Sequence, residues 1–250
     1  MAFNVLTPVS DWVLNETKSL SPQAMRYKIR CHSLEAGMPD LEGVNVAIIG
    51  VPEHRNKVNY TEAEINFDTV RMALYAMFPG NWSSVLADLG DILPGNSVED
   101  TYFALKEIVS HLRQMNIIPL IIGGSHDLIY PLYQSYQELN QLVNIVSVDR
   151  SFDFSQEDEL ISGRSYMSKI IMNHPNLLNS YTNLGYQSYY CAQEERDLIE
   201  KLFFDAIRLG NVLDHVEQTE PFFRDADIVG FDMKCLSWDA TSDKHHGTPN

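Results

Sequence analysis

The chain has 250 residues, of which 44% are hydrophobic and 21% charged, and its formal net charge is −16 at pH 7. This length and composition are typical of a soluble globular protein with one well-buried core. The negative charge argues against nucleic acid and anionic membrane surfaces as partners, because most of the exterior would repel them. No apolar run approaches the roughly 18 residues that a membrane-spanning helix needs, so no membrane partner is expected.

The three cysteines, Cys31, Cys191 and Cys235, are widely separated and show no Cys-x-x-Cys spacing. An odd number without such a motif argues against a disulfide framework and against a zinc–thiolate site. The first residues also lack a basic stretch followed by an apolar one, so no secretory signal is expected. Together these features predict a cytoplasmic protein.

Residues 1–43 have weak periodicity and predict an N-terminal extension with one helix near residues 21–31. The pattern changes at residues 44–51, a nearly continuous apolar run that is followed by Pro52. A short run of this kind is typical of a strand buried on both faces. The chain contains no repeat, low-complexity tract or Gly/Ser/Pro linker beyond this point, so we expect one α/β domain over residues 44–250.

Strand and helix patterns alternate along the rest of the chain. Helices are expected at 61–78, from Ser97 to about residue 115, at 127–139 and at 194–204, and strands at 85–92, 117–122, 143–148, 186–191 and 227–232. Alternation at this interval implies a three-layer α/β sandwich, with helices on both faces of a mainly parallel central sheet. Right-handed crossovers place the carboxyl ends of the strands along one edge, where open α/β sheets bind ligands.

Polar clusters directly follow three of the expected strands. They are Gly123-Gly-Ser-His-Asp127, Asp149-Arg-Ser-Phe-Asp153 and Asp232-Met-Lys234. Because these strand ends share an edge of the sheet, we expect one imidazole and three carboxylates to converge there, from His126, Asp149, Asp153 and Asp232.

Carboxylates that are packed together raise one another's pKa values unless a cation lies between them. One histidine with several carboxylates suits Mn²⁺ or another first-row divalent metal. The alternative is that each of these residues is only a helix cap or a loop carboxylate on a charged surface. Their occurrence at three strand ends of one sheet favours a functional site.

The three clusters resemble the metal motifs of the ureohydrolases, the family of arginase, agmatinase and formimidoylglutamase. In that family the motifs read Gly-Gly-Asp-His-Ser, Asp-x-His-x-Asp and Asp-x-Asp. Further similarity lies in Ile48-Ile-Gly-Val-Pro52 and Asp88-Leu-Gly-Asp91, so the resemblance covers about residues 44–250. It implies an arginase-like fold, two Mn²⁺ ions on six protein ligands, small amidine or amino-acid-like substrates, and a homo-oligomer.

Two of the six ligand positions differ from the family pattern. Ser151 stands where the family has its second histidine, and Lys234 stands at the second Asp of Asp-x-Asp. By the resemblance, the four matching residues form the whole shell of one metal, and both lost positions belong to the other metal alone. The resemblance therefore implies at most one Mn²⁺, with a metal-free site as the alternative. Its ligands would be His126, Asp149, Asp153 and Asp232.

Lys234 has two interpretations. Its ammonium group, placed where a second cation would lie, can balance Asp149 and Asp232 and keep their pKa values low. It would then help to polarise a water or a substrate beside Asp149 and Asp153, the candidate catalytic carboxylates. In the other interpretation Lys234 forms only a salt bridge that closes an inactive site.

The family reaction is hydrolysis of a guanidinium or formimino C–N bond, in which the metals lower the pKa of the attacking water. Arginases have a proton-shuttling histidine a little after the second motif, but residues 161–166 contain none, and Ser162 or Tyr166 would take its place. The Gly-Thr-Pro at 247–249 resembles the start of a segment after which family members continue. The C-terminal part of the family fold is therefore expected to be missing, and His245 and His246 are expected to be solvated.

Two functions stay open. The first is a divergent ureohydrolase with a degenerate, at most mononuclear site, acting on an arginine-, agmatine- or formiminoglutamate-like amidine. The second is a non-catalytic protein of the same fold with a binding or assembly role, which the changes at Ser151 and Lys234 favour. An Asp-based phosphotransferase has less support, because the spacing of Asp149 and Asp153 differs from that of the usual nucleophile pair and no Gly-rich phosphate loop precedes a helix.

Overall fold

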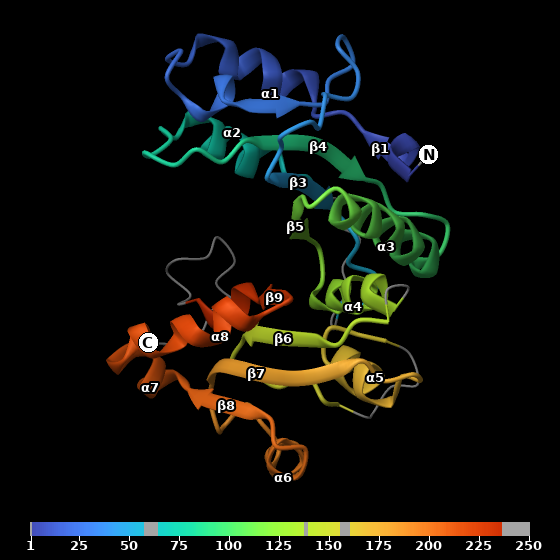
Figure 1. Cartoon of the computed structure of the whole chain (residues 1–250), viewed down its shortest axis with the longest axis vertical. Helices are drawn as coiled ribbons and strands as arrows, with labels where there is room; N and C mark the ends of the chain where they lie inside the picture. Colours follow the sequence, from blue (N-terminus) through green and yellow to red (C-terminus); the bar gives the residue numbers. More distant parts are fainter. Residues whose placement is uncertain (1, 58–64, 138–139, 156–160, 237–250) are drawn as a thin grey trace. The chain divides into compact units, whose positions relative to one another are not determined.

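The computed structural model describes residues 2–57, 65–137, 140–155 and 161–236 (Figure 1). The chain divides into two compact units, the first formed by Met1–Arg55 and Asn59–Pro131 and the second by Asn56–Val58 and Leu132–Asn250. Each unit contains its own sheet, and the two are described separately. The assignment of residues 44–250 to one domain stays a prediction.

The sheet of the first unit is parallel except at one edge. Its strand order is β1-β4-β3-β5, with β2 also paired to β4, and only the β1–β4 pairing is antiparallel. The strands are β1 (Leu6–Thr7), β2 (Ile29–Cys31), β3 (Val46–Val51), β4 (Leu86–Ile92) and β5 (Ile118–Gly123). The apolar run at residues 44–51 thus forms a central strand whose last five residues are buried, as its composition predicted.

The helices of the first unit include a long one whose start the sequence predicted closely. The helix α3 (Val98–Gln114) begins with a capping box, in which Ser97 and Asp100 exchange backbone-to-side-chain hydrogen bonds. It buries Leu105, Ile108 and Leu112, which recur at helical spacing. The other helices are α1 (Asp11–Glu16), α2 (Asp68–Ala76) and α4 (Ile129–Gln137), the last of which begins in the first unit and ends in the second.

The prediction of a helix near residues 21–31 is wrong. Met25–Tyr27 form only a 3-10 turn, and Ile29–Cys31 form β2, which pairs in parallel with Leu86–Asp88 of β4. Ile29 is buried in an apolar cluster with Val13 and Tyr75, so sheet pairing and burial outweigh the weak local spacing. The N-terminal residues therefore contribute two strands to the sheet.

The sheet of the second unit is entirely parallel, in the order β8-β7-β6-β9. Its strands are β6 (Val143–Val148), β7 (Leu178–Tyr186), β8 (Asp205–Arg208) and β9 (Ile228–Phe231). Its helices are α5 (Tyr166–Met172), α6 (Gln193–Lys201), α7 (Leu209–Asp214) and α8 (Glu220–Asp225), in addition to most of α4. The strands β6 and β9 are neighbours although about 80 residues separate them in sequence, which brings two of the polar clusters to adjacent strand ends.

The prediction of a strand at residues 186–191 is also wrong. The strand in this region, β7, ends at Tyr186, and the residues after it form a turn. The polar side chains of Ser180, Thr182 and Asn183 interrupt the apolar pattern, yet Thr182 and Asn183 are buried in the sheet. The sequence also did not predict β8, α7 and α8. The architecture is nevertheless the predicted α/β class with mainly parallel sheets.

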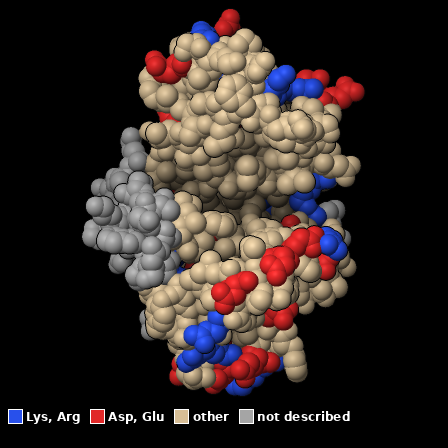
Figure 2. All heavy atoms as spheres, turned by 90° about the vertical axis from the view of Figure 1, so that its left-hand side faces the viewer, with Lys and Arg blue, Asp and Glu red and all other residues tan. Residues whose placement is uncertain are grey.

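No helix among the described residues is long and apolar enough to cross a membrane. On the face drawn in Figure 2, Lys and Arg side chains lie among Asp and Glu side chains.

Candidate metal site

The carboxyl ends of β6 and β9 bring three carboxylates together in the second unit. Asp149 directly follows β6, and Asp232 directly follows β9, with its backbone N–H donating to the carbonyl oxygen of Val148 at 3.0 Å. Asp153 lies four residues after Asp149 on the same loop. The three residues are only 0%, 9% and 3% exposed for Asp149, Asp232 and Asp153. Asp149 and Asp153 each offer a carboxylate oxygen within 4.8 Å of the other, and the joining of Asp232 to the same ion stays a prediction.

Ser151 joins the two aspartates of the loop. Its hydroxyl donates to Oδ1 of Asp153 at 3.1 Å and lies 3.4 Å from Oδ1 of Asp149, which also accepts the Ser151 backbone N–H at 3.2 Å. Asp153 has a φ of 57°, a left-handed backbone conformation that residues other than glycine rarely adopt. Such a conformation persists only where its surroundings enforce it, and it is concentrated at functional sites.

Side chains from β7 and α5 hold this loop by its backbone carbonyls. Asn183 donates from Nδ2 to the carbonyl oxygen of Ser151 at 2.8 Å, and Ser168 donates to that of Phe154 at 2.9 Å. Asn183 is fully buried. These two residues position Asp149 and Asp153, and sequence reasoning missed them because they carry no motif. A polar residue inside an otherwise buried strand next to the site was the available signal.

Lys234 is bound to the same cluster. Its Nζ lies 2.8 Å from Oδ2 of Asp232, and its backbone N–H donates to Oδ1 of Asp232 at 2.8 Å. Burial lowers the pKa of Lys234, but attraction to Asp153, Asp232 and Asp149 outweighs it and raises the pKa above its ordinary value. The ammonium group therefore stays charged beside Asp232, and both interpretations of Lys234 stay open.

The charges of this cluster suit one divalent cation. Three carboxylates and one ammonium group carry a formal charge of −3 + 1 = −2, confined to largely buried side chains. Buried like charges require a compensating cation. Carboxylate oxygens are also the ligands that Mn²⁺ and Mg²⁺ prefer. The chemistry of these residues thus fits a divalent cation of this kind.

His126 belongs to the first unit, at the start of the 3-10 turn His126–Leu128 that follows β5. Gly124, two residues before His126, lies close to the backbone of Glu53. A Cβ at position 124 would lie 1.9 Å from the carbonyl oxygen of Glu53. The backbone N–H of Ser125 donates to the same oxygen at 2.9 Å. This loop needs glycine at position 124. The ligation of one metal by His126 and the carboxylates of the other unit stays a prediction.

Asp127, next to His126, is fully buried and accepts two hydroxyl hydrogen bonds. The donors are Tyr102 of α3 and Ser125. Burial raises the pKa of Asp127 above its ordinary value, although both hydrogen bonds act to lower it. Asp127 therefore ties the histidine loop to α3 and was not predicted as a site residue.

Of the residues considered for a proton shuttle, Tyr166 is fully buried on α5, and burial together with the charge of Asp153 raises its pKa. Ser162 is buried as well, and its Oγ lies 3.0 Å from that of Ser165.

Burial raises the pKa of the thiols of Cys191 and Cys235 to about 12. His245 and His246 lie outside the described residues.

Comparison with known proteins assigns the chain to a protein family. The model of the arginase family matches residues 44–239, which includes all three polar clusters. The chain belongs to the arginase family. The resemblance to the ureohydrolases seen in the sequence is therefore confirmed.

Curated arginase-family relatives match over about half of this chain. A formimidoylglutamase of Streptococcus gordonii is 27% identical over 135 residues, which are 50% of this chain and 40% of that protein. A mitochondrial agmatinase of Gallus gallus is 27% identical over 123 residues, which are 46% of this chain and 36% of that protein. The match thus spans about two fifths of the length of these relatives.

Solved structures of the family share the fold. A formiminoglutamase of Trypanosoma cruzi, solved with Mn²⁺, superimposes with a TM-score of 0.71 at 17% identity, over 84% of this chain and 78% of that one. A hypothetical agmatinase of Burkholderia thailandensis gives a TM-score of 0.68 at 20% identity, over 94% and 74% of the two chains. The arginase fold predicted from the sequence is confirmed.

Proposed function

We propose that this chain is a divergent ureohydrolase that binds one Mn²⁺ and hydrolyses a C–N bond of a linear amidine, either a guanidino or a formimino compound. The observation that supports it is the buried cluster of three carboxylates and one ammonium group at the ends of β6 and β9. Its formal charge of −2 matches one divalent cation. Family membership supports the reaction class, since relatives are named as formimidoylglutamases and an agmatinase.

The proposed ligands of this ion are His126, Asp149, Asp153 and Asp232. When bound, the ion would lower the pKa of a water and orient it for attack on the trigonal carbon of the substrate. Asn183 and Ser151 would keep Asp149 and Asp153 in place, because they fix the loop that presents both carboxylates. Orientation of this kind is the usual contribution of residues that surround a metal's ligands.

Lys234 takes the place of a second ion in this proposal. Its ammonium group pairs with Asp232 and balances part of the negative charge of the cluster. It would also donate to the substrate or to the departing amine. The proposed substrate is a small molecule carrying a cationic amidine, which the acidic cluster and the net charge of −16 would attract. A cytoplasmic location and a homo-oligomer are part of the same proposal.

The second candidate function is a non-catalytic protein of the same fold. It is favoured by two observations, namely that both oxygens of Asp232 already bond to Lys234 and that Ser151 replaces a family histidine. In that case Lys234 compensates the carboxylates without any metal, and the fold serves binding or assembly.

Metal content distinguishes the two functions. The purified protein is dialysed with and without Mn²⁺ and analysed for metal per chain, then assayed for urea, ammonia or formamide release from arginine, agmatine and formiminoglutamate. We expect one ion per chain and Mn²⁺-dependent turnover that Asp149→Ala abolishes. No bound metal in the wild type, together with no turnover, would support the non-catalytic alternative. Two ions per chain would show that the ligand assignment is wrong.

A further inference from the structure

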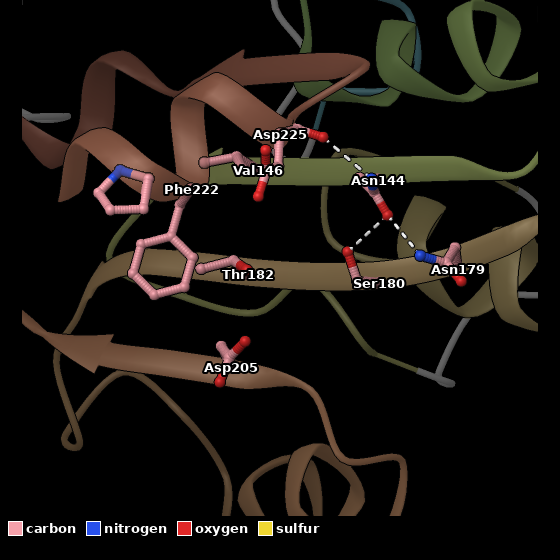
Figure 3. Close-up of a pocket in the computed structure, with 9 residues that line it drawn as sticks. Asn144, Val146, Asn179, Ser180, Thr182, Asp205, Phe222 and Asp225 are labelled. Carbon is pink, nitrogen blue, oxygen red and sulfur yellow. Dashed lines mark hydrogen bonds between the residues drawn. The ribbon is translucent and has the colours of Figure 1, made fainter.

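The second unit contains a cavity at the end of the sheet opposite to the carboxylate cluster. Its volume is about 340 Å³, and it lies between the faces of β6, β7 and β8 and the helix α8 (Figure 3). Its polar lining comes from Asn144, Asn179, Ser180, Thr182, Asp205 and Asp225, and its apolar lining from Val146, Pro221 and Phe222. Pockets for small molecules span roughly 300–1,000 Å³, so this one would suit a small ligand.

The amide of Asn144 organises one wall of the cavity. Its Oδ1 accepts from Nδ2 of Asn179 and from Oγ of Ser180, both at 2.8 Å, and its Nδ2 donates to the carbonyl oxygen of Asp225 at 2.9 Å (Figure 3). Both ends of the amide are thus engaged within the protein. A wall fixed in this way is pre-organised for a ligand.

Thr182 presents its hydroxyl group to the cavity. The residue is only 4% exposed and lines the cavity from the middle of β7 (Figure 3). In the part of the chain that the structure describes, its hydroxyl makes no hydrogen bond, although the rest of the residue is enclosed by the protein. This hydroxyl therefore offers a hydrogen bond to whatever occupies the cavity.

Two carboxylates give the cavity its charge. Asp205 starts β8 and Asp225 ends α8, and among the described residues neither side chain is in a salt bridge. Carboxylates accept hydrogen bonds and attract cations. The ring of Phe222 and the side chain of Val146 form the apolar part of the lining. An aromatic ring and an aliphatic surface favour the body of an organic cation over a hydrated metal ion.

We propose that this cavity binds a small organic cation, an alkyl amine or alkyl guanidine. The charged group pairs with Asp205 or Asp225, the hydroxyl of Thr182 hydrogen-bonds to it, and the alkyl chain packs against Phe222. The cavity is separate from the carboxylate cluster of β6 and β9, so this binding needs no metal and goes beyond the proposed hydrolysis.

The test is isothermal titration calorimetry of the full chain with 1,4-diaminobutane at low salt, without added metal. We expect saturable binding to one site, and at least tenfold weaker binding of the uncharged 1,4-butanediol. Asp205→Asn and Thr182→Val, which nearly conserve the shapes of their side chains, should each weaken diamine binding about tenfold. Asp149→Asn, at the other end of the sheet, should leave it unchanged. Thermal unfolding would confirm that each variant is folded.

The proposal is overturned if the diamine does not bind, or if butanediol binds equally well. It is also overturned if Asp149→Asn abolishes binding while Asp205→Asn and Thr182→Val do not, because the diamine would then occupy the carboxylate cluster. The absence of bound Mn²⁺ or of amidine hydrolysis would refute the proposed function and leave this result unaffected. Chemical shifts of the Val146 and Thr182 methyl groups give an independent measure of the location.

Discussion

Ser125 and Asp127, the residues on either side of His126, are hydrogen-bonded to each other through their side chains. The ureohydrolase motif has an aspartate before the histidine and a serine after it, whereas here the two residue types are exchanged. The exchange keeps one carboxylate and one hydroxyl next to the histidine. Asp127 additionally accepts from Tyr102, which connects the histidine loop to α3.

Removing this carboxylate should destabilise the first unit. Asp127→Ala leaves the buried hydroxyls of Tyr102 and Ser125 without their acceptor, and we expect a loss of about 2–4 kcal/mol in the free energy of unfolding. Asp127→Asn should lose less, because its amide oxygen still accepts one hydroxyl. Urea denaturation measures both variants. Equal stability of the alanine and asparagine variants would contradict the role given to these hydrogen bonds.

A buried arginine holds together two carboxylates of β4 in the same unit. Arg71 of α2 is 1% exposed, and its guanidinium group pairs with Asp88 at 2.9 Å and with Asp91 at 2.8 Å. Arg71→Ala leaves Asp88 buried without its cation, which should cost about 3–5 kcal/mol. Arg224→Ala is the control, because its pair with Glu220 is exposed and should contribute at most about 0.5 kcal/mol. A similar loss in both variants, measured by urea denaturation, would refute this account.

Glu53 makes the first unit sensitive to acid. Burial raises its pKa, but hydrogen bonds from Arg55 and Thr101 outweigh burial and bring the pKa below its ordinary value. A carboxyl whose pKa is lowered on folding stabilises the protein above its unfolded pKa, and this contribution is lost as the pH falls through the folded pKa. Stability of the wild type relative to Glu53→Gln should therefore be greatest near pH 7 and shrink toward pH 3. A difference that is independent of pH would contradict the assignment.

The sequence predicted strands best where burial on both faces produces an apolar run, as in β3. It failed at β7, because Thr182 and Asn183 are buried polar residues and interrupt that run. The grouping of Asp149 with Asp232 followed from the rule that parallel strands end at one edge. The partner of Asn183 could not be predicted, since its bond to Ser151 joins residues 32 apart and depends on the pairing of β6 with β7.

Asn183 provides a test of that missed contact. Asn183→Ala removes the donor to the Ser151 carbonyl and should loosen the loop that carries Asp149 and Asp153. Loss of such a support typically lowers metal affinity by about 10- to 100-fold. Mn²⁺ affinity measured by calorimetry, compared with Asn179→Ala at the opposite end of the same strand, separates this effect from general disturbance of β7. Equal affinities in the two variants would argue against a positioning role.

Replacing two residues should convert the site from one metal to two. Lys234→Asp exchanges the ammonium group for a carboxylate, which removes the internal cation and makes the formal charge of the cluster −4. Ser151→His adds the imidazole that the family motif carries at this position. With both changes, metal analysis should find two Mn²⁺ per chain instead of one, because the added charge requires a second cation and both missing ligand types are restored.

The single variants serve as controls for this conversion. Ser151→His alone keeps the ammonium group of Lys234 beside Asp232, so its metal content should stay at one ion per chain. Lys234→Met removes the charge but adds no ligand, so this variant should also bind one ion. Its carboxylates then lose the ammonium group that offsets their mutual repulsion. Two ions bound by the wild type, or one by the double variant, would show that Lys234 does not take the place of the second metal.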